Sequence, residues 1–134
     1  MSLDAALAEA QTGIPECVAV GYVDMITGML MGVKTVDSHP ENVLNLVAAA
    51  TADLFQGPSV TSIERLFRKS RGQVEDGTHY FKEIIVTSDN LLHVFSRSKK
   101  YPDQAAVFVC RNSANIGMVL SKTRIALGII EKSV

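Results

Sequence analysis

The residues with the greatest potential for covalent chemistry are the two cysteines, Cys17 and Cys110. Each lies inside a continuous apolar run of the sequence, at residues 17–23 and 105–110. A reactive cysteine needs polar, partly exposed surroundings that stabilise its thiolate. We therefore expect both thiols to be inert core side chains. Two cysteines without a C-x-x-C pair also do not make a disulfide framework.

The serines and glycines form no recognisable catalytic motif. The sequence contains no G-x-S-x-G nucleophile motif, no G-x-G-x-x-G dinucleotide motif and no phosphate-binding loop. We therefore expect no catalytic residue and no cofactor, and an enzyme is the function class with the least support.

The candidate metal ligands are the three histidines, His39, His79 and His93. A zinc site usually takes four ligands with recognisable local spacing, and this sequence shows no such spacing. His79 and His93 flank a predicted hairpin, but their registers differ by several residues, so we do not expect them to pair. His39 belongs to a predicted helix cap. The sequence therefore predicts ordinary surface histidines and no metal site.

The densest group of charges is the basic run Arg65, Arg68, Lys69 and Arg71. The simpler interpretation is a solvated helix end, where the helix dipole favours cations. The second interpretation is a contact to an acidic partner. Arg65, Arg68 and Lys69 are spaced i, i+3 and i+4 and share a helix face, and like charges at that spacing repel. Nothing in the expected fold requires this arrangement.

Composition limits the class of protein. The chain has 134 residues, of which 47% are hydrophobic and 20% charged. This length and composition predict one globular domain, which we place at residues 3–132. Thirteen basic and fourteen acidic residues give a net charge of −1, whereas nucleic-acid binders usually show a basic excess. With no signal peptide and no apolar run of about 20 residues, we expect a cytoplasmic protein without a membrane span.

The first third of the chain predicts one helix and a β-hairpin. The amphipathic segment Leu3–Gln11 predicts a short helix. The apolar run from Cys17 to Val23 is typical of a central strand that is covered on both faces. A turn closed by Gly28 leads to a second strand over Met29–Val36. Because Met29 and Met31 alternate with Leu30, we expect both methionines to point into the core.

The middle of the sequence predicts a long helix with a break. Ser38-His39-Pro40-Glu41 has the spacing of a capping box at its start. Gly57-Pro58 interrupts the helix, and Ser59 or Thr61 caps its continuation to about Arg71. The apolar residues of its first part follow a helical period and form its main stripe: Val43, Leu44, Leu46, Val47, Ala50 and Leu54. Phe55, Leu66 and Phe67 lie beyond that stripe.

The last part of the chain predicts three consecutive strands and a helix. The strands are Tyr80–Ser88, Leu91–Arg97 and residues 105–110, and the helix begins near Ser113. The two continuous apolar strands require helices on both faces of the sheet. We therefore expect an α/β (α+β) fold, a three-layer α/β/α sandwich around a five-stranded antiparallel sheet. The first hairpin joins the three-stranded meander at one end.

Two features of this arrangement favour self-association. The strand Tyr80–Ser88 begins the meander and should lie at a sheet edge, where a long apolar strand without proline invites pairing with another chain. The middle helix carries more apolar surface than one face needs. These features predict a homodimer. The candidate residues for a partner or dimer interface are Phe55, Arg65, Leu66, Phe67, Arg68, Ile84, Ile85 and Val86.

The order of elements resembles the roadblock / dynein light chain family, whose relatives include bacterial partners of Ras-like GTPases. The resemblance covers about residues 3–131 and depends on pattern and element order. One departure is the Gly57-Pro58 break, since this helix is usually continuous in the family. The segments that carry the resemblance are Glu16–Val36, Pro40–Lys69, Glu83–Phe95, Ala105–Arg111 and Asn115–Leu120.

The resemblance implies a profilin-like fold and a non-enzymatic function. Members of the family dimerise by joining their sheets at the meander edge and packing their long helices together. They bind and regulate small GTPases or serve as adaptors, and no catalytic residue carries over to this sequence. The implied function is therefore a dimeric interaction module that acts on a Ras-like GTPase or within a scaffold.

A rival function is a small-molecule sensor, because profilin-like and PAS-like domains both combine an antiparallel sheet with flanking helices. A deep pocket between the sheet and a helix would favour this rival. Against it, we expect large side chains to fill both faces of the sheet.

Overall fold

The computed structural model describes residues 1–37 and 41–134. The predicted capping box and the cap role of His39 lie outside the described residues. The helices and strands, in chain order, are α1 (Leu3–Gly13), β1 (Cys17–Asp24), β2 (Met29–Thr35), α2 (Glu41–Gln56), α3 (Pro58–Ser70), β3 (Glu83–Thr87), β4 (Leu91–Arg97), β5 (Gln104–Arg111) and α4 (Ile116–Glu131).

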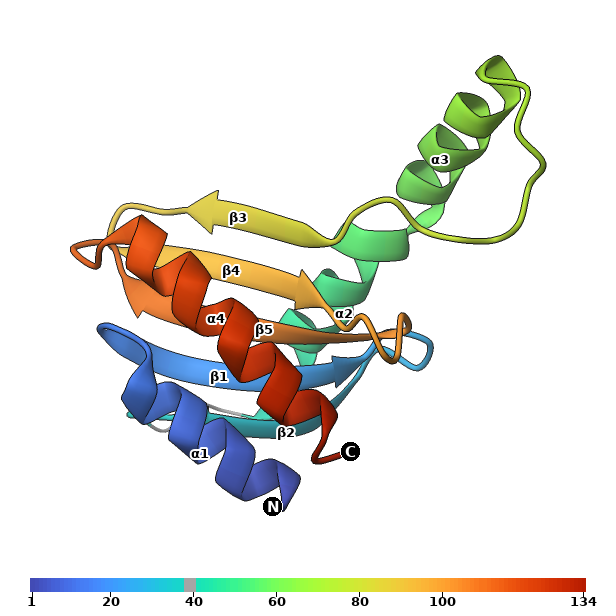
Figure 1. Ribbon diagram of the computed structural model, residues 1–134. Coiled ribbons are helices and arrows are strands. Elements are labelled where there is room, and N and C mark those ends of the chain that lie inside the picture. The colour runs from blue at the N-terminus through green and yellow to red at the C-terminus, as the bar shows by residue number, and fades with distance from the viewer. Residues whose placement is uncertain (38–40) are drawn as a thin grey trace.

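The five strands form one antiparallel sheet in the order β2-β1-β5-β4-β3. The strands β3, β4 and β5 form the predicted meander, and the β1–β2 hairpin joins it through the pairing of β1 with β5 (Figure 1). The two continuous apolar runs are thus the neighbouring strands β1 and β5. The predicted five-stranded α+β fold is confirmed.

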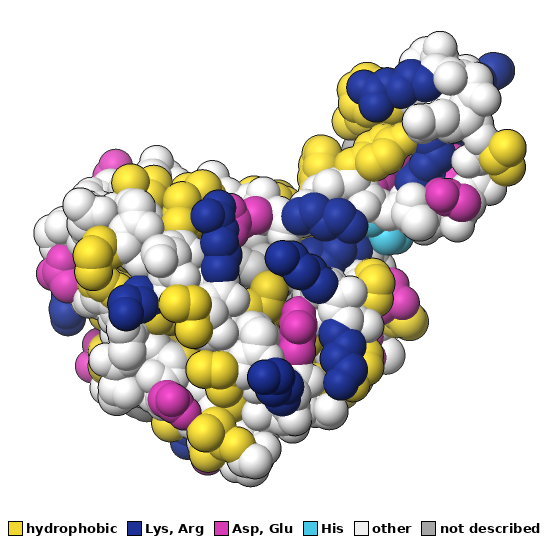
Figure 2. Space-filling view, viewed as in Figure 1, with side chains coloured by type: hydrophobic (Ala, Val, Ile, Leu, Met, Phe, Trp, Pro, Cys, Tyr) yellow, Lys and Arg dark blue, Asp and Glu magenta, His cyan; other side chains and the backbone are white. Residues whose placement is uncertain are grey.

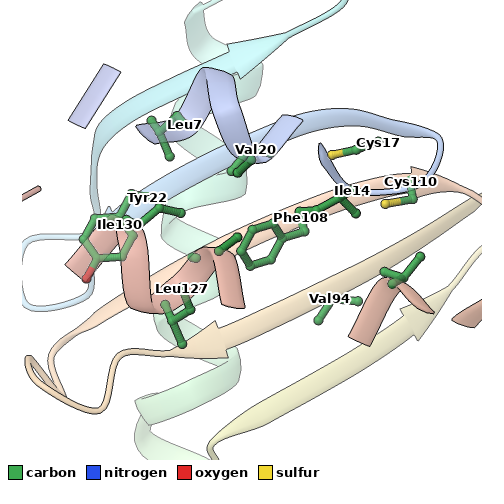
Figure 3. Packing of buried hydrophobic residues seen from close by; sticks show 14 of the residues in the cluster. Leu7, Ile14, Cys17, Val20, Tyr22, Val94, Phe108, Cys110, Leu127 and Ile130 are labelled. Carbon is green, nitrogen blue, oxygen red and sulfur yellow. The ribbon is translucent and has the colours of Figure 1, made fainter. Parts of the chain in front are cut away.

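One face of the sheet packs against α1 and α4. Alternate residues of β1 and β5, among them Tyr22 and Phe108, point into this layer and are fully buried. Leu7 of α1 and Ile130 of α4 pack in the same cluster of buried residues (Figure 3). Strand periodicity of two therefore builds this larger core.

The opposite face packs against α2 in a smaller core. The residues of α2 that turn to the sheet are Ala48, Thr51 and Phe55, all fully buried. The other neighbours in this cluster are Val23, Met25, Phe95, Ala105 and Val107. The apolar periodicity of the helix does not indicate which of its sides faces the sheet. The main apolar stripe lies largely outside, and Phe55, placed beyond it, points inward.

The helix break at Gly57-Pro58 is confirmed, but its cap differs from the prediction. Gly57 is the N-cap of α3 and Pro58 occupies the first turn, where a missing N–H costs nothing. A Cβ at Gly57 would lie 2.7 Å from the carbonyl oxygen of Asp53, so only glycine fits there. Neither Ser59 nor Thr61 caps the helix. Instead, the Thr61 hydroxyl donates to the Gly57 carbonyl at 2.6 Å.

Beyond the break, α3 projects away from the sheet, and residues 71–82 return alongside it to reach β3 (Figure 1). We call residues 58–82 the arm. Because the return segment packs on α3, β3 begins at Glu83. The predicted strand began three residues earlier, at Tyr80.

The prediction that Met29 and Met31 lie in the core is wrong. Their side chains are 66% and 41% exposed. Tyr22 pairs with Gly32 and Val23 with Leu30, so Met31 is the extra residue of a β-bulge. A bulge breaks the alternation of side chains along a strand, and β2 is also an edge strand with less cover.

Candidate interaction surface

The edge strand β3 leaves one side of its backbone free. The amide of Arg97 donates to the carbonyl of Lys82 at 2.8 Å, and the amide of Ser88 donates to the carbonyl of Leu91 at 2.9 Å. In an antiparallel ladder, hydrogen-bonded positions alternate with positions whose backbone groups point the other way. The even-numbered residues of β3 therefore bond to β4. The N–H and C=O of Ile85, at the centre of the strand, point outward from the sheet.

The side chains of β3 divide between the two faces of the sheet. Ile84 is half-buried and packs against the α2-side core. Ile85 and Val86 are 41% and 40% exposed. Glu83 makes an ion pair with Arg124 of α4 at 2.9 Å, which fixes the start of the strand. The sheet thus ends in an ordered strand with exposed apolar side chains and an unpaired backbone edge.

The outer face of α2 is also apolar and exposed. Five of its exposed apolar residues follow helical spacing along one side of the helix. We call them the α2 stripe; they are Val43, Leu46, Val47, Ala50 and Leu54. Leu46 is 68% exposed. A helix that is apolar on both faces usually has a partner on each, and here the sheet covers only one.

The buried Arg97 fixes the C-terminal end of α2. Its guanidinium donates to the carbonyls of Phe55 at 3.0 Å, Pro102 at 2.8 Å and Phe81 at 2.8 Å. It also donates to the side chain of Gln56 at 2.8 Å. Desolvation by burial lowers the pKa of Arg97. Phe55, a candidate interface residue, therefore belongs to the protein's own core and is unavailable to a partner.

Arg68 is likewise not a surface cation. It is 4% exposed, and its guanidinium makes ion pairs with Glu75 and Asp76 of the return segment. The same group donates to the Thr78 hydroxyl at 3.0 Å and lies 4.9 Å from the centre of the Tyr80 ring. The expectation that nothing in the fold requires Arg68 is therefore wrong. Its role is to hold the two halves of the arm together.

A second buried polar group joins the same two segments. Glu64 is 1% exposed and contacts Nδ1 of His79 at 2.8 Å. It also accepts a hydrogen bond from the amide of Tyr80. Glu64 and Arg68 are spaced i, i+4, so one side of α3 faces the return segment through both.

The other sides of α3 are exposed and carry apolar and basic residues together. Leu66 and Phe67 are 65% and 50% exposed, and Ile63 is 42% exposed. Arg65 and Lys69 are exposed beside them. Figure 2 shows apolar and basic side chains side by side on the projecting arm. Of the predicted basic group, Arg65 and Lys69 thus share this surface, while Arg68 does not.

The structure also places the chemically interesting side chains. Cys17 and Cys110 lie opposite each other on β1 and β5, both buried. The hydrogen bond with Cys17 and burial raise the pKa of the Cys110 thiol. His93 is half-buried, and burial lowers its pKa. Within residues 1–37 and 41–134, no three His, Cys, Asp or Glu side chains are grouped to hold a metal ion.

A cavity of about 620 Å³ lies between α2 and the sheet. It is bordered by Ala19 and Gly21 of β1, Val109 of β5, and Leu44 and Val47 of α2. The expectation that large side chains fill this face of the sheet is therefore wrong at this end. At this end the sheet presents Ala19 and Gly21, whose small side chains leave space below the helix.

No protein-family model matches the sequence, and no curated protein matches it significantly. Solved structures do match over nearly the full chain. The Roadblock/LC7 domain from Streptomyces avermitilis is 14% identical, with a TM-score of 0.69, covering 98% of this chain and 97% of that one. The gliding protein MglB from Thermus thermophilus is 15% identical, with a TM-score of 0.68, covering 96% and 85%.

A third similar structure is described as MglB with a tetrameric arrangement. It is 15% identical, with a TM-score of 0.69, covering 97% of this chain and 88% of that one. Agreement of this extent at such low identity shows a shared fold. The structure described here therefore has the Roadblock/LC7 fold. In the described part of the chain, no helix has the length and apolar character to cross a membrane.

Proposed function

We propose that this chain, whose fold is that of the roadblock domains, is a non-enzymatic interaction module that forms a homodimer and binds a Ras-like GTPase. Residues 3–132 form its single domain. The observation that carries the proposal is the outward backbone edge of β3 together with the exposed α2 stripe. Exposed strand edges and apolar patches of this kind are typical of protein interfaces.

The edge of β3 suits pairing with a second copy of itself. The outward-pointing residues Glu83, Ile85 and Thr87 are symmetric about Ile85. A two-fold axis through Ile85, perpendicular to the sheet, pairs Glu83 of one copy with Thr87 of the other. Because this axis is perpendicular to the sheet, corresponding faces of the two sheets lie on the same side of the joined sheet. The two α2 helices then lie on the same side of one continuous sheet, where their stripes can meet.

A Ras-like GTPase is the partner that the family resemblance implies. The structural similarity to MglB supports the same general role. The arm presents a separate surface for such a partner, since Leu66 and Phe67 are exposed beside Arg65 and Lys69. Apolar anchors surrounded by charges are the usual composition of an interface. The partner surface that fits is apolar and acidic.

Gel filtration with a Ras-like GTPase from the same organism tests the partner directly. The GTPase is loaded with GDP or with a non-hydrolysable GTP analogue and mixed with the chain. We expect co-elution in one of the two nucleotide states and its loss in Leu66→Glu. Val74→Glu is the matched control, because Val74 is 85% exposed on the other half of the arm. Separate elution in both nucleotide states would contradict the proposal.

A second candidate function, small-molecule sensing, is favoured by the 620 Å³ cavity between α2 and the sheet. Cavities of this volume are typical of ligand sites. The two surfaces meet at Val43 and Val47, which border the cavity and also belong to the α2 stripe, whereas Leu46, Ala50 and Leu54 of the stripe do not line the cavity.

A further inference from the structure

The cavity lies under one half of α2 only. Towards the C-terminal end of the helix, Phe55 packs with Met25 and Phe95 and fills the space above the sheet. Towards the N-terminal end, the helix contributes Val43, Leu44 and Val47 to the cavity wall. The sheet below that half presents mainly valines, together with Ala19, Gly21, Leu30 and Leu91. One helix therefore packs closely at one end and spans a hollow of about 620 Å³ at the other.

Two small residues on the central strand β1 leave the space that forms the bottom of the cavity. Ala19 and Gly21 point to the α2 side, alternating with Val20 and Tyr22 that point to the α1–α4 side. A Cβ added at Gly21 would meet only ordinary contacts, the nearest atom being a Leu30 methyl carbon at 3.4 Å. A Cβ is therefore tolerated here, so steric crowding at that atom does not explain the glycine.

The wall of the cavity is aliphatic. The described residues that line it include no aromatic ring, so it offers no stacking surface for a planar ring system. Its apolar lining consists of valine, leucine, alanine and glycine side chains. Such a wall fits a flexible aliphatic chain, whose methylene groups it removes from water.

One end of the cavity is polar and carries a cation. Arg111 follows Val107 and Val109 at alternate positions of β5, so it lies on the same face at the end of the strand. In the described part of the chain, the Arg111 guanidinium has no hydrogen bond or ion pair. Asn90 and Asn112 border the same end, and Asp37 brings the one carboxylate among the described lining residues.

Two of the neighbouring polar side chains at this end have hydrogen-bond partners of their own. The Asn112 amide donates to the carbonyl of Asp89 at 2.8 Å, and the Ser113 hydroxyl donates to the carboxylate of Glu16 at 2.8 Å. Among the described lining residues, Arg111 is therefore the cation available to a ligand that enters the cavity. A guanidinium recognises a carboxylate through paired, charge-assisted hydrogen bonds.

We infer that the cavity is a binding site for an amphipathic aliphatic carboxylate, with its chain under α2 and its carboxylate at Arg111. The fatty acids of medium length are the simplest members of this class. This inference goes beyond the protein-binding role, because it needs neither the edge of β3 nor the arm. Its failure would leave the proposed dimer and GTPase partner untouched.

Calorimetric titration with a chain-length series tests the aliphatic part of the site. Saturated fatty acids of six to twelve carbons are titrated below the concentrations at which they self-associate. Each methylene that enters the cavity should tighten Kd about fourfold, until the chain fills the available space. We expect saturable binding of one molecule per chain with this trend. No saturable binding, or affinity independent of chain length, would overturn the inference.

The alcohol and the amine of the same chain length test the head group. We expect the carboxylate to bind most tightly, the alcohol less tightly and the amine least. Arg111→Gln should remove the advantage of the carboxylate over the alcohol and leave binding of the alcohol unchanged. Tightest binding of the amine would place Asp37 at the head group instead and would contradict the assignment of Arg111.

Filling the cavity with protein tests whether it is a real hollow. Ala19→Leu should abolish fatty-acid binding and leave Tm unchanged or raise it. Ala106→Leu, on the neighbouring strand but in the fully packed opposite core, is the matched control and should lower Tm through overpacking. If Ala19→Leu lowers Tm as much as the control, or if it still binds the fatty acid, the site is not where we place it.

Discussion

Arg97 lies over the ring of Phe55, with its guanidinium carbon 4.9 Å from the ring centre, and donates to the carbonyl of the same residue at 3.0 Å. One side chain therefore contacts both the ring and the backbone at the end of α2. Because Phe55 anchors the α2-side core, this pair fixes the helix on the sheet.

Replacing Arg97 tests this anchoring. Arg97→Met leaves the buried carbonyl oxygens of its partners without a donor, so we expect the free energy of unfolding to fall by roughly 2–4 kcal/mol. Arg97→Lys keeps the charge but not the planar geometry, and should cost less. The exposed Arg124 provides the control, since Arg124→Met should cost under about 1 kcal/mol. Equal urea midpoints for Arg97→Met and Arg124→Met would contradict the account.

The arm should open when Arg68 is removed. Arg68→Ala eliminates the ion pairs to Glu75 and Asp76 together with the hydrogen bonds to Thr78. We expect faster amide hydrogen exchange over residues 73–82 and unchanged exchange in β4 and β5, because the arm projects from the sheet. Lys69→Ala, an exposed neighbour, should leave the arm protected. Unchanged exchange in Arg68→Ala would show that these contacts do not hold the return segment.

Stability should fall at alkaline pH through Tyr22. Its hydroxyl donates to Oε1 of Gln104 at 2.8 Å, and burial raises its pKa from 10.0 to about 12. The unfolded chain loses this proton near pH 10, so the stability from the neutral buried phenol is present below that pH. It is lost as the pH rises from 10 towards 12. The urea midpoint of the unchanged protein should fall over this interval, and the midpoint of Tyr22→Phe should fall less. Equal decreases of the midpoint in both proteins would exclude Tyr22 as the cause.

The exposed cations of the arm should control the rate of partner binding. Changing both Arg65 and Lys69 to glutamate should slow association with a Ras-like GTPase while leaving the circular dichroism spectrum unchanged. Electrostatic contacts act mainly on association rates, and the slowing should shrink as salt screens exposed charges beyond about 8–10 Å. Stopped-flow measurement of the association rate at low salt tests this prediction. An association rate equal to that of the unchanged protein would favour the simpler interpretation, in which these residues belong to a solvated helix end.

The topology could be predicted because it depends on local signals. Apolar runs define β1 and β5, and short polar turns separate the strands, so the element order and the edge position of β3 follow. The break at Gly57-Pro58 could be predicted equally well, because glycine and proline have strong local effects.

The orientation of α2 could not be predicted in the same way. Two apolar lines run along this helix, one through Ala48, Thr51 and Phe55 and the other through Leu46 and Leu54. Hydrophobic periodicity cannot tell which line meets the sheet when both are apolar. The choice depends on the distant contact with Arg97, which no local pattern reveals. The cavity under the helix depends on the same placement.

The burial of Arg68 could not be predicted for a related reason. Its partners Glu75 and Asp76 lie in a polar segment without a periodic pattern, which is typical of a plain loop. The opposite charges of Glu64 and Arg68 at spacing i, i+4, followed by two acidic residues, are the signal that could have indicated a buried network. A cation on a helix is usually exposed, and only tertiary contacts decide otherwise.

The backbone edge of β3 supplies a matched pair of variants for the proposed homodimer. Proline removes one amide donor. At Ile85 that donor points outward, so Ile85→Pro should remove a contact between chains and keep the β3–β4 ladder. At Ile84 the donor bonds to β4, so Ile84→Pro should damage the fold itself and shift the circular dichroism spectrum.

Sedimentation equilibrium at about 30 μM, a concentration at which a modest interface should hold, is the decisive test of the proposed homodimer. We expect the unchanged chain to sediment at twice its 14.5 kDa mass, and Ile85→Pro to sediment at 14.5 kDa with a native circular dichroism spectrum. A 14.5 kDa species for the unchanged chain, or a dimer that persists in Ile85→Pro with a native spectrum, would contradict this expectation.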